Sequence, residues 1–403
     1  MRRITSEIPS SVATGSLFVV ISLSVFISGT LSAELFPTGK VLGSESCSTS
    51  GCHGGAGPNR GAHTIWKRYD PHTASAATLS TGRSRAMAGK LGIDDATQST
   101  SCTVCHAPNR QVSPSMFADP VLLEKNSVEM NTVSCANCHG GAEKWLLSHT
   151  RPDYPRGALA ELGMRQLGSS YERANSCVAC HQNLSDELLF AKHPPLIFEL
   201  DGMLVAEGKH WREDKEFSNA QTWLVGQAVA LREVAAQSLR EPAESIAADK
   251  AEDFKERRNA EIEAIKELLK SGGTAFKGTG KALVSEADQY AKLISATPIN
   301  AGQTRDILGR LLKNQEPFRA GAFDSLPKEY RSWAAGCYAE RLVLAIDRLN
   351  ESLVNAGQKP PIADEPLNAL FDAAKPPMAF DSVASDVFIA KLAAVAESFS
   401  SNP

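Results

Sequence analysis

Apolar residues recur at helical spacing through the carboxyl-terminal half of the chain. The two clearest series, the second of which ends at a Gly-Gly helix stop, are Trp223, Leu224, Ala228, Leu231, Ala235 and Leu239, and then Ile262, Ile265, Leu268 and Leu269. Similar runs, separated by proline-containing stretches, cover Ala282–Ile294, Thr304–Lys313, Ser332–Val354 and Ser382–Ser398. The pattern predicts about five to seven helices.

The amino-terminal half has a different pattern. Between Gly43 and Arg110 the residues Val, Ile, Leu and Phe are scarce, so this stretch lacks the side chains for an ordinary core. Cysteine and histidine almost vanish beyond Trp211, where Ala, Leu, Glu and Lys become more frequent. We therefore expect a boundary near 212–218, with one domain over 34–215 and a helical domain of unknown role over 216–403.

The first residues have the pattern of an export segment. Arg2 and Arg3 supply positive charge, and an apolar run follows over 17–31. Residues 1–33 are therefore expected to be a signal peptide. Because the run is long and Glu7 precedes it, an uncleaved N-terminal membrane anchor is the alternative. The expected location is the periplasm or another exported compartment.

Nine cysteines occur in the chain, and all but Cys337 form close pairs that are followed directly by histidine. These groups are Cys47, Cys52 and His53; Cys102, Cys105 and His106; Cys135, Cys138 and His139; and Cys177, Cys180 and His181. The last three have the spacing Cys-x-x-Cys-His, which is typical of c-type haem attachment. Two thiols must reach two vinyl groups of one porphyrin while the histidine reaches its iron. In the first group the longer loop contains Ser and Gly residues that allow a bulge. The sequence predicts four covalently attached haem c groups, each with one iron.

Three other uses of paired cysteines explain less. Disulfide bonds suit an exported chain, but they give no reason for a histidine after every pair. A structural zinc site needs two pairs that converge on one metal, again without an adjacent histidine. A thioredoxin-like motif occurs once, near a βαβ pattern. Haems are also large apolar bodies that replace a missing core. The predicted fold class is mainly α: a haem-packed multihaem cytochrome domain with little regular sheet, followed by an α-helical C-terminal domain.

Four of the nine histidines directly follow a cysteine pair. The other five are candidates for the distal ligands of the haem irons. These five are His63, His72, His149, His193 and His210. We expect His63, His72 and His149 to be distal ligands and His193 to be a further candidate. His210, in a charged stretch, is expected to be solvated. Two imidazoles on one iron leave no vacancy, so such a haem transfers electrons and binds small ligands poorly.

The chain resembles the cytochrome c-five-five-four family in three features. It has the four attachment motifs, a His-x-x-Trp-x-x-x-x-x-His element after the first motif (His63, Trp66, His72), and a histidine ten residues beyond the third motif, His149. The resemblance covers roughly Gly43 to Trp211. It implies a tetrahaem carrier of the kind that accepts electrons from hydroxylamine oxidoreductase in ammonia oxidisers. Related domains occur in many exported bacterial multihaem proteins.

The resemblance also implies axial ligands. It places His149 opposite His53 at the first haem. The two histidines after the first motif, His63 and His72, are implied to be the distal ligands opposite His139 and His181. The resemblance does not fix which of the two faces which attachment histidine. In the family the second haem lacks a sixth protein ligand and lies under a loop after the fourth motif. Here that loop contains His193, which is a candidate to close the site at His106.

Charge and composition narrow the function. With a formal net charge of −4 and a sequence pI near 6.2, nucleic acid is not an expected partner. The leading hypothesis is a periplasmic electron carrier or relay that meets redox partner proteins, with an exported oxidoreductase as donor and another cytochrome as acceptor. The alternative is a redox enzyme that converts a small nitrogen or sulfur species at one five-coordinate haem. A haem-based sensor or adaptor is a third class.

The helical half shows no catalytic constellation in its sequence. Its Glu and Lys residues alternate at helical spacing, which is typical of solvated faces with i,i+4 pairs. Cys337 lies in an apolar pattern and is expected to be a buried small hydrophobe. The working hypothesis for this half is a cap over the haem domain or a docking surface for a redox partner.

Overall fold

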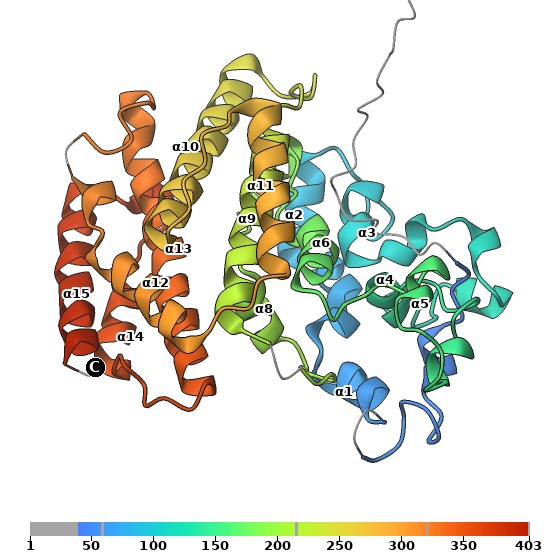
Figure 1. Ribbon diagram of the computed structural model, residues 1–403. Coiled ribbons are helices and arrows are strands. Elements are labelled where there is room, and N and C mark those ends of the chain that lie inside the picture. The colour runs from blue at the N-terminus through green and yellow to red at the C-terminus, as the bar shows by residue number, and fades with distance from the viewer. Residues whose placement is uncertain (1–38, 58–59, 214–216, 320, 402–403) are drawn as a thin grey trace, which may run out of the picture. The chain divides into compact units, whose positions relative to one another are not determined.

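A computed structural model describes residues 39–57, 60–213, 217–319 and 321–401, all of which belong to one compact unit. The protein is 62% helical, with essentially no strands in these ranges. Val41 and Phe117 form an isolated parallel bridge. The predicted mainly α fold class is therefore confirmed (Figure 1). The predicted signal peptide or anchor lies outside the described residues.

Short helices with small apolar clusters build the cysteine-rich half. The α-helices are α1 (Ala62–Tyr69), α2 (Gly82–Lys90), α3 (Thr100–His106), α4 (Cys135–His139), α5 (Ala158–Glu161), α6 (Ser170–His181), α7 (Asp186–Phe190) and α8 (Leu200–Ala206). Short 3₁₀ helices join them: η1 (Ser44–Cys47), η2 (Pro71–Ser80), η3 (Pro108–Gln111), η4 (Pro114–Met116), η5 (Pro120–Leu123) and η6 (Ser148–Thr150). Before α6, buried apolar side chains pack together in three small clusters. One of these clusters is built on Val41, Val112 and Phe117. The scarcity seen in the sequence is thus present in the fold.

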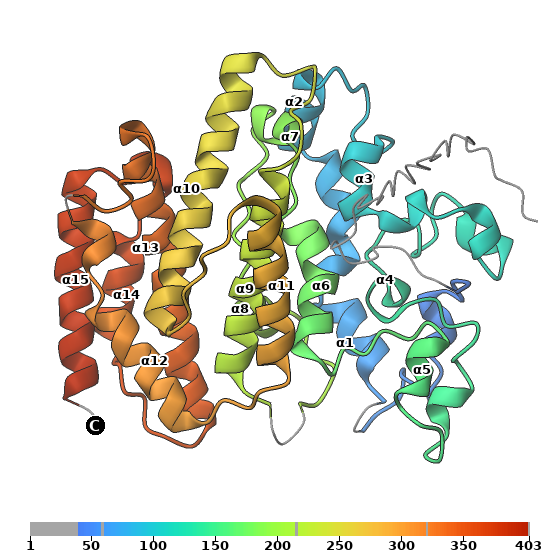
Figure 2. The same ribbon diagram turned by 45° about the horizontal axis from the view of Figure 1, so that its top comes forward.

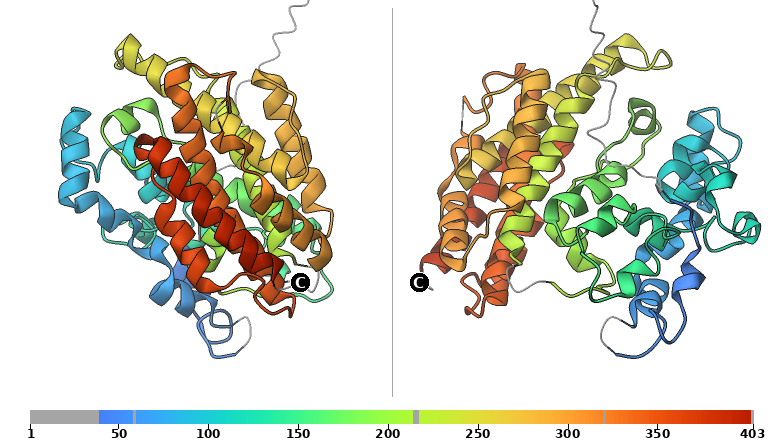
Figure 3. Two further views of the ribbon diagram at one scale, coloured as in Figure 1. Left: turned by 90° about the vertical axis from the view of Figure 1, so that its left-hand side faces the viewer. Right: turned by 45° about the vertical axis from the view of Figure 1, so that its right-hand side comes forward.

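Longer helices build the carboxyl-terminal half, as the apolar series predict. They are α9 (Asn219–Gln237), α10 (Ala248–Gly272), α11 (Gly280–Ser295), α12 (Ala301–Lys313), α13 (Lys328–Asn355), α14 (Asp364–Ala373) and α15 (Ser382–Ser400), with η7 (Glu316–Phe318) and η8 (Pro377–Ala379). In Figure 3 the red helix α15 runs alongside the orange helices, and α12 and α14 contact it. α14 has no counterpart among the predicted runs.

The main hydrophobic core reaches into the cysteine-rich half. Ala174 and Val178 of α6 are fully buried in the same cluster as Trp223 of α9. Figure 2 shows α6 beside α9 and α11, and both of these helices contact it. The helix that bears the fourth cysteine pair is therefore packed against the helical half. The division at 215 and 216 stays a prediction.

A buried polar network joins the same three helices. Arg232 of α9 is fully buried and pairs with Glu233 and, across to α11, with Asp288, each at 2.7 Å. Its guanidinium also donates to Asn175 on α6 at 2.7 Å, and the Tyr171 hydroxyl donates to Asp288 at 2.7 Å. Because a buried charge is costly unless it is paired and hydrogen-bonded, this network fixes how α6 lies on the helical half.

Glu199 combines a capping role with an unfavourable environment. Its carboxylate accepts hydrogen bonds from the backbone N–H groups of Asp201 (3.2 Å) and Gly202 (2.5 Å) at the start of α8. Burial, and then the nearby Asp201 carboxylate, raise the pKa of Glu199 to about 7. The folded protein therefore holds a proton on this group that the unfolded chain releases near pH 4.5. Stability contributed by this group is lost as the pH rises between these two values.

We expect Glu199→Gln to stabilise the protein at pH 8 and to have little effect at pH 5. At roughly 1.4 kcal/mol per pKa unit, the gain above the window amounts to up to about 3 kcal/mol. Thermal unfolding of both proteins from pH 5 to 8 measures it, with the exposed Glu241→Gln as the control. A difference in melting temperature that does not change with pH would contradict the assignment.

Candidate functional site

The cysteine pairs of the second, third and fourth motifs lie on helices that end at the attachment histidine. α3, α4 and α6 have His106, His139 and His181 as their last residues. Within each helix the two cysteines are three positions apart and therefore share one face. Each motif thus presents two thiols on one side of a helical turn and an imidazole at its end.

The first motif reaches a similar arrangement through a folded loop. The backbone N–H of His53 donates to the Cys47 carbonyl at 3.0 Å, so the four-residue spacer turns back on itself. A Cβ atom on Gly54 would lie 1.7 Å from the Ser48 carbonyl oxygen. Only glycine fits this close approach. This glycine directly follows the attachment histidine, whereas a Cβ atom on Gly51, inside the spacer, would meet nothing within 4 Å.

The four motifs converge in space through their thiols. The thiols of Cys47 in the first motif and Cys135 in the third lie close enough to lower the pKa of Cys47 and to raise that of Cys135. The thiols of Cys105 in the second motif and Cys180 in the fourth have the same effect on each other's pKa. Cys138 of the third motif acts electrostatically on Cys177 of the fourth. Motifs that are far apart in the sequence are therefore neighbours, in the order first, third, fourth, second.

Three of the four attachment histidines face a second histidine. The ring centres are 6.2 Å apart for His53 and His149, 6.0 Å for His181 and His72, and 6.3 Å for His139 and His210. Iron–imidazole bonds are about 2 Å long and a ring nitrogen lies about 1 Å from its ring centre, so two imidazoles on opposite sides of one iron have ring centres roughly 6 Å apart. These separations fit a haem iron between each pair.

The facing histidines are oriented by hydrogen bonds at Nδ1. That nitrogen contacts the Leu146 carbonyl in His149 (2.6 Å), the Asp70 carboxylate in His72 (2.8 Å) and the Gly208 carbonyl in His210 (3.0 Å). An acceptor at Nδ1 fixes the proton there and leaves Nε2 free to bind a metal. All three rings thus share the arrangement that metal-binding histidines use.

Burial keeps two attachment imidazoles in the neutral form that binds metal. It lowers the pKa of His139, with a smaller effect of His210, and the pKa of His181, with a smaller effect of His72, each to about 4. A neutral imidazole is the ligand form, so neither ring must lose a proton at neutral pH. In contrast, the hydrogen bond that the His72 ring donates to the Asp70 carboxylate raises the pKa of His72.

The second motif has a different environment. The ring of His106 contacts the Thr78 hydroxyl (2.9 Å) and the Ser75 carbonyl (3.2 Å) through Nδ1. His193 is close enough to act electrostatically on His106, but across the described chain no ring contact pairs a second histidine with it. The predicted role of His193 as a ligand there stays a prediction.

Among the described residues no ring contact joins His63 to the third attachment histidine. It is 6% exposed, its backbone N–H donates to the His53 carbonyl at 3.0 Å, and its ring centre lies 5.7 Å from that of Trp66. Its Nε2 lies 3.7 Å from the Glu45 carboxylate and has no hydrogen-bond partner among the described residues. His72 and His181 form the pair that the resemblance allows. The role of His63 stays a prediction.

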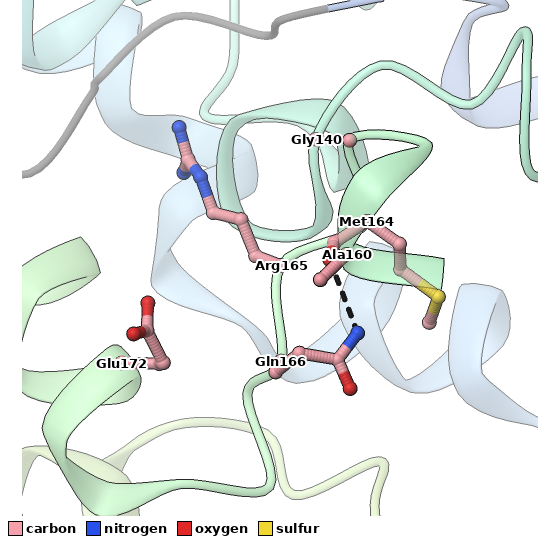
Figure 4. A pocket seen from close by; sticks show the side chains of 7 residues that line it. Gly140, Ala160, Met164, Arg165, Gln166 and Glu172 are labelled. Atoms are coloured by element: carbon pink, nitrogen blue, oxygen red, sulfur yellow. Dashed lines mark hydrogen bonds between the residues drawn. The ribbon is translucent and has the colours of Figure 1, made fainter. Parts of the chain in front are cut away.

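A cleft of about 260 Å³ adjoins the third motif (Figure 4). Gly140, directly after the attachment histidine, lines it together with Met164, Arg165 and Gln166. Gln166 donates to the Met164 carbonyl at 3.2 Å. The Arg165 side chain extends in the opposite direction from that of Gln166 and donates to the Asn137 carbonyl. Arg165 therefore places positive charge at the third motif, where a haem propionate would be stabilised.

Asp70, His72 and Glu207 bring their ligand atoms within 4.8 Å of one another. Asp70 is 4% exposed and also accepts the His72 backbone N–H at 2.9 Å, so it orients His72 from two sides. Because His72 faces His181, this group is best understood as the support of one imidazole and not as a separate metal site.

Comparison with known proteins identifies the class of this site. Residues 46–140 match the sequence model of the family described as Cytochrome c554 and c-prime. Over this stretch the chain is thus similar to c-type cytochromes, a class that carries covalently bound haem c with its iron and is usually exported. The resemblance to the cytochrome c-five-five-four family is confirmed for this stretch, which contains the first three motifs. No curated protein and no solved structure matches the chain. Within the described ranges no helix is long and apolar enough to span a membrane.

His210 is the site residue that sequence reasoning did not include. Its charged neighbours suggested a solvated side chain, but its ring lies against that of His139. One signal in the sequence pointed to it: it is the last histidine, and the chain from Trp211 onward has none. Its partner could not be deduced from spacing, because the two residues come from distant segments.

We expect Asp70→Asn to raise the reduction potential of one haem, the one attached at His181, by roughly 60 mV, a tenfold change in the equilibrium constant for one electron. An amide accepts a weaker hydrogen bond from His72, which makes the imidazole a poorer donor to iron. A spectroscopic redox titration measures the shift, with the exposed Asp94→Asn as the control. Unchanged potentials in both variants would contradict the role of Asp70.

Proposed function

We propose that this protein is an exported tetrahaem c-type cytochrome that relays electrons between redox partner proteins. The observation that carries the proposal is the set of four cysteine pairs with attachment histidines, three of which face a second imidazole at 6.0–6.3 Å. When bound, the haem irons supply one-electron chemistry between their ferrous and ferric states. An iron with two imidazole ligands has no place for a substrate, which favours transfer over catalysis at these sites.

The order of the motifs supports a relay. Electrostatic influence of one thiol on the pKa of another, within the pairs Cys47 and Cys135, Cys138 and Cys177, and Cys105 and Cys180, supports one continuous series of the four motifs. The two ends of this series are the first and second sites. Cys52, in the first motif, is exposed, so we propose the first site as the one that meets a partner protein.

The proposal also names the classes of protein that donate electrons to this cytochrome and accept electrons from it. An exported oxidoreductase is the proposed donor and another cytochrome the proposed acceptor, in keeping with the family resemblance of residues 46–140. The segment 1–33 is proposed to direct export as a signal peptide, with a membrane anchor as the alternative. The helical half is proposed to hold α6, and with it the fourth site, in place through Arg232 and its partners.

One observation favours a second function, a redox enzyme that converts a small nitrogen or sulfur species. His106 is without a facing imidazole in the described chain, so an iron bound there would keep an open position. The nearby loop contains Lys192 with a φ of 74°, an unusual conformation for a residue other than glycine. Such strain is often found near functional sites.

We expect the fully reduced protein to pass its electrons to an oxidised small cytochrome without consuming hydroxylamine, nitrite or nitric oxide. Stopped-flow absorbance measures the electrons transferred, and each small species is then supplied as the sole oxidant or reductant. A relay is expected to transfer about four electrons per protein molecule to the oxidised cytochrome and to turn over none of the small species. Sustained turnover of one of them, with little transfer to the cytochrome, would instead establish the enzyme.

A further inference from the structure

The last helix of the described chain, α15, has two apolar faces. Phe388, Leu392 and Val395 are fully buried and belong to the main hydrophobic core. The opposite face is exposed, and in the left view of Figure 3 the red helix runs across the side of the molecule nearest the viewer. Four exposed residues on this face are apolar and form what we call the α15 stripe: Val383, Val387, Ala390 and Ala394.

The α15 stripe has the spacing of a helix that pairs with another helix. Its members are separated by four, three and four residues. This alternation keeps one face turned toward the partner in a two-stranded coiled coil. Val383 is 68% exposed and Val387 is 47% exposed. Because the solvent-facing side of a helix is normally polar, a continuous apolar series along it indicates a contact surface.

Two charged residues flank the α15 stripe on opposite sides. Asp386 and Lys391 are exposed, and neither has an ion-pair partner among the described residues. At about 100° per residue, Asp386 lies roughly 70° to one side of the centre of the stripe and Lys391 roughly 70° to the other side. In a coiled coil these are the g and e positions, where charged residues set the choice of partner and the direction of the helices.

The two charges select one arrangement of the helices. When two copies of α15 run parallel and in register, Asp386 of each copy faces Lys391 of the other, and the two-fold symmetry gives two such pairs. An antiparallel pair would instead bring both Asp386 side chains to one side of the contact and both Lys391 side chains to the other. Because like charges across a contact repel, the surface is complementary to a second copy in the parallel direction.

We propose that this protein forms a homodimer in which α15 pairs in parallel with α15 of a second copy. α15 packs on α12, α13 and α14, none of which carries an attachment motif. The contact therefore gives the helical half a role that is separate from the haem sites. Because the contact comprises one exposed helix face, it is small, and the dimer forms in an equilibrium that depends on concentration. The inference does not depend on the proposed function.

Sedimentation velocity of the purified holoprotein at increasing concentration measures this pairing. The wild type is expected to shift from the monomer mass to twice that mass. Val387→Lys places a charge in the middle of the α15 stripe and is expected to stay a monomer. The matched control is Leu293→Lys, at a residue of α11 that is 64% exposed, and it is expected to dimerise like the wild type. A wild type that stays monomeric at every concentration, or equal behaviour of the two variants, would overturn the proposal.

Charge reversal tests the direction of the helices. Asp386→Lys and Lys391→Asp each place like charges across the parallel contact, and each is expected to weaken the dimer about tenfold. The double variant restores opposite charges and is expected to dimerise like the wild type. An antiparallel contact predicts no loss in either single variant, because like charges already face each other there. Unchanged dimerisation in the single variants, or a double variant no stronger than they are, contradicts the parallel arrangement.

Discussion

Attachment of flat apolar cofactors to paired thiols is the constraint on which this fold depends. Before α6 the buried apolar residues form only small clusters, such as Val41 with Val112 and Phe117, although the chain there is more than a hundred residues long. Such clusters bury too little apolar surface to offset the entropy of ordering the chain. In the proposed cytochrome, porphyrins tied to the cysteine pairs supply the missing interior, and the short helices α3, α4 and α6 present thiols and imidazoles to them.

The two halves of the described chain are joined at the residues that serve the haem sites. α6 carries the fourth motif and contributes Ala174 and Val178 to the main core, while Arg232 on α9 donates to Asn175 on its surface. The segment after α8 leads from that core to His210. Under the proposed function, the helical half supports the haem sites through these contacts.

Local features were predictable from the sequence, and tertiary ones were not. The attachment motifs, the series from Trp223 to Leu239 and the stop at Gly272-Gly273 depend on neighbours in the chain. The helices cover the predicted series, except that α9 ends at Gln237 and Leu239 lies beyond it. The pairing of His53 with His149 followed from a family resemblance. In contrast, His210 and His139 come from distant segments, and the packing of Gly208 on Asp70 beside them is a contact that no periodicity encodes. α14 is short, and this explains why its pattern was missed.

The account requires four porphyrins bound through thioether bonds at Cys47, Cys52, Cys102, Cys105, Cys135, Cys138, Cys177 and Cys180. Intact-mass spectrometry of the mature, exported polypeptide under denaturing conditions tests this requirement directly, since non-covalent cofactors are lost there. The account predicts the polypeptide mass plus four haem masses, and peptides that carry haem at each of the four motifs. A polypeptide with no added haem mass would contradict it.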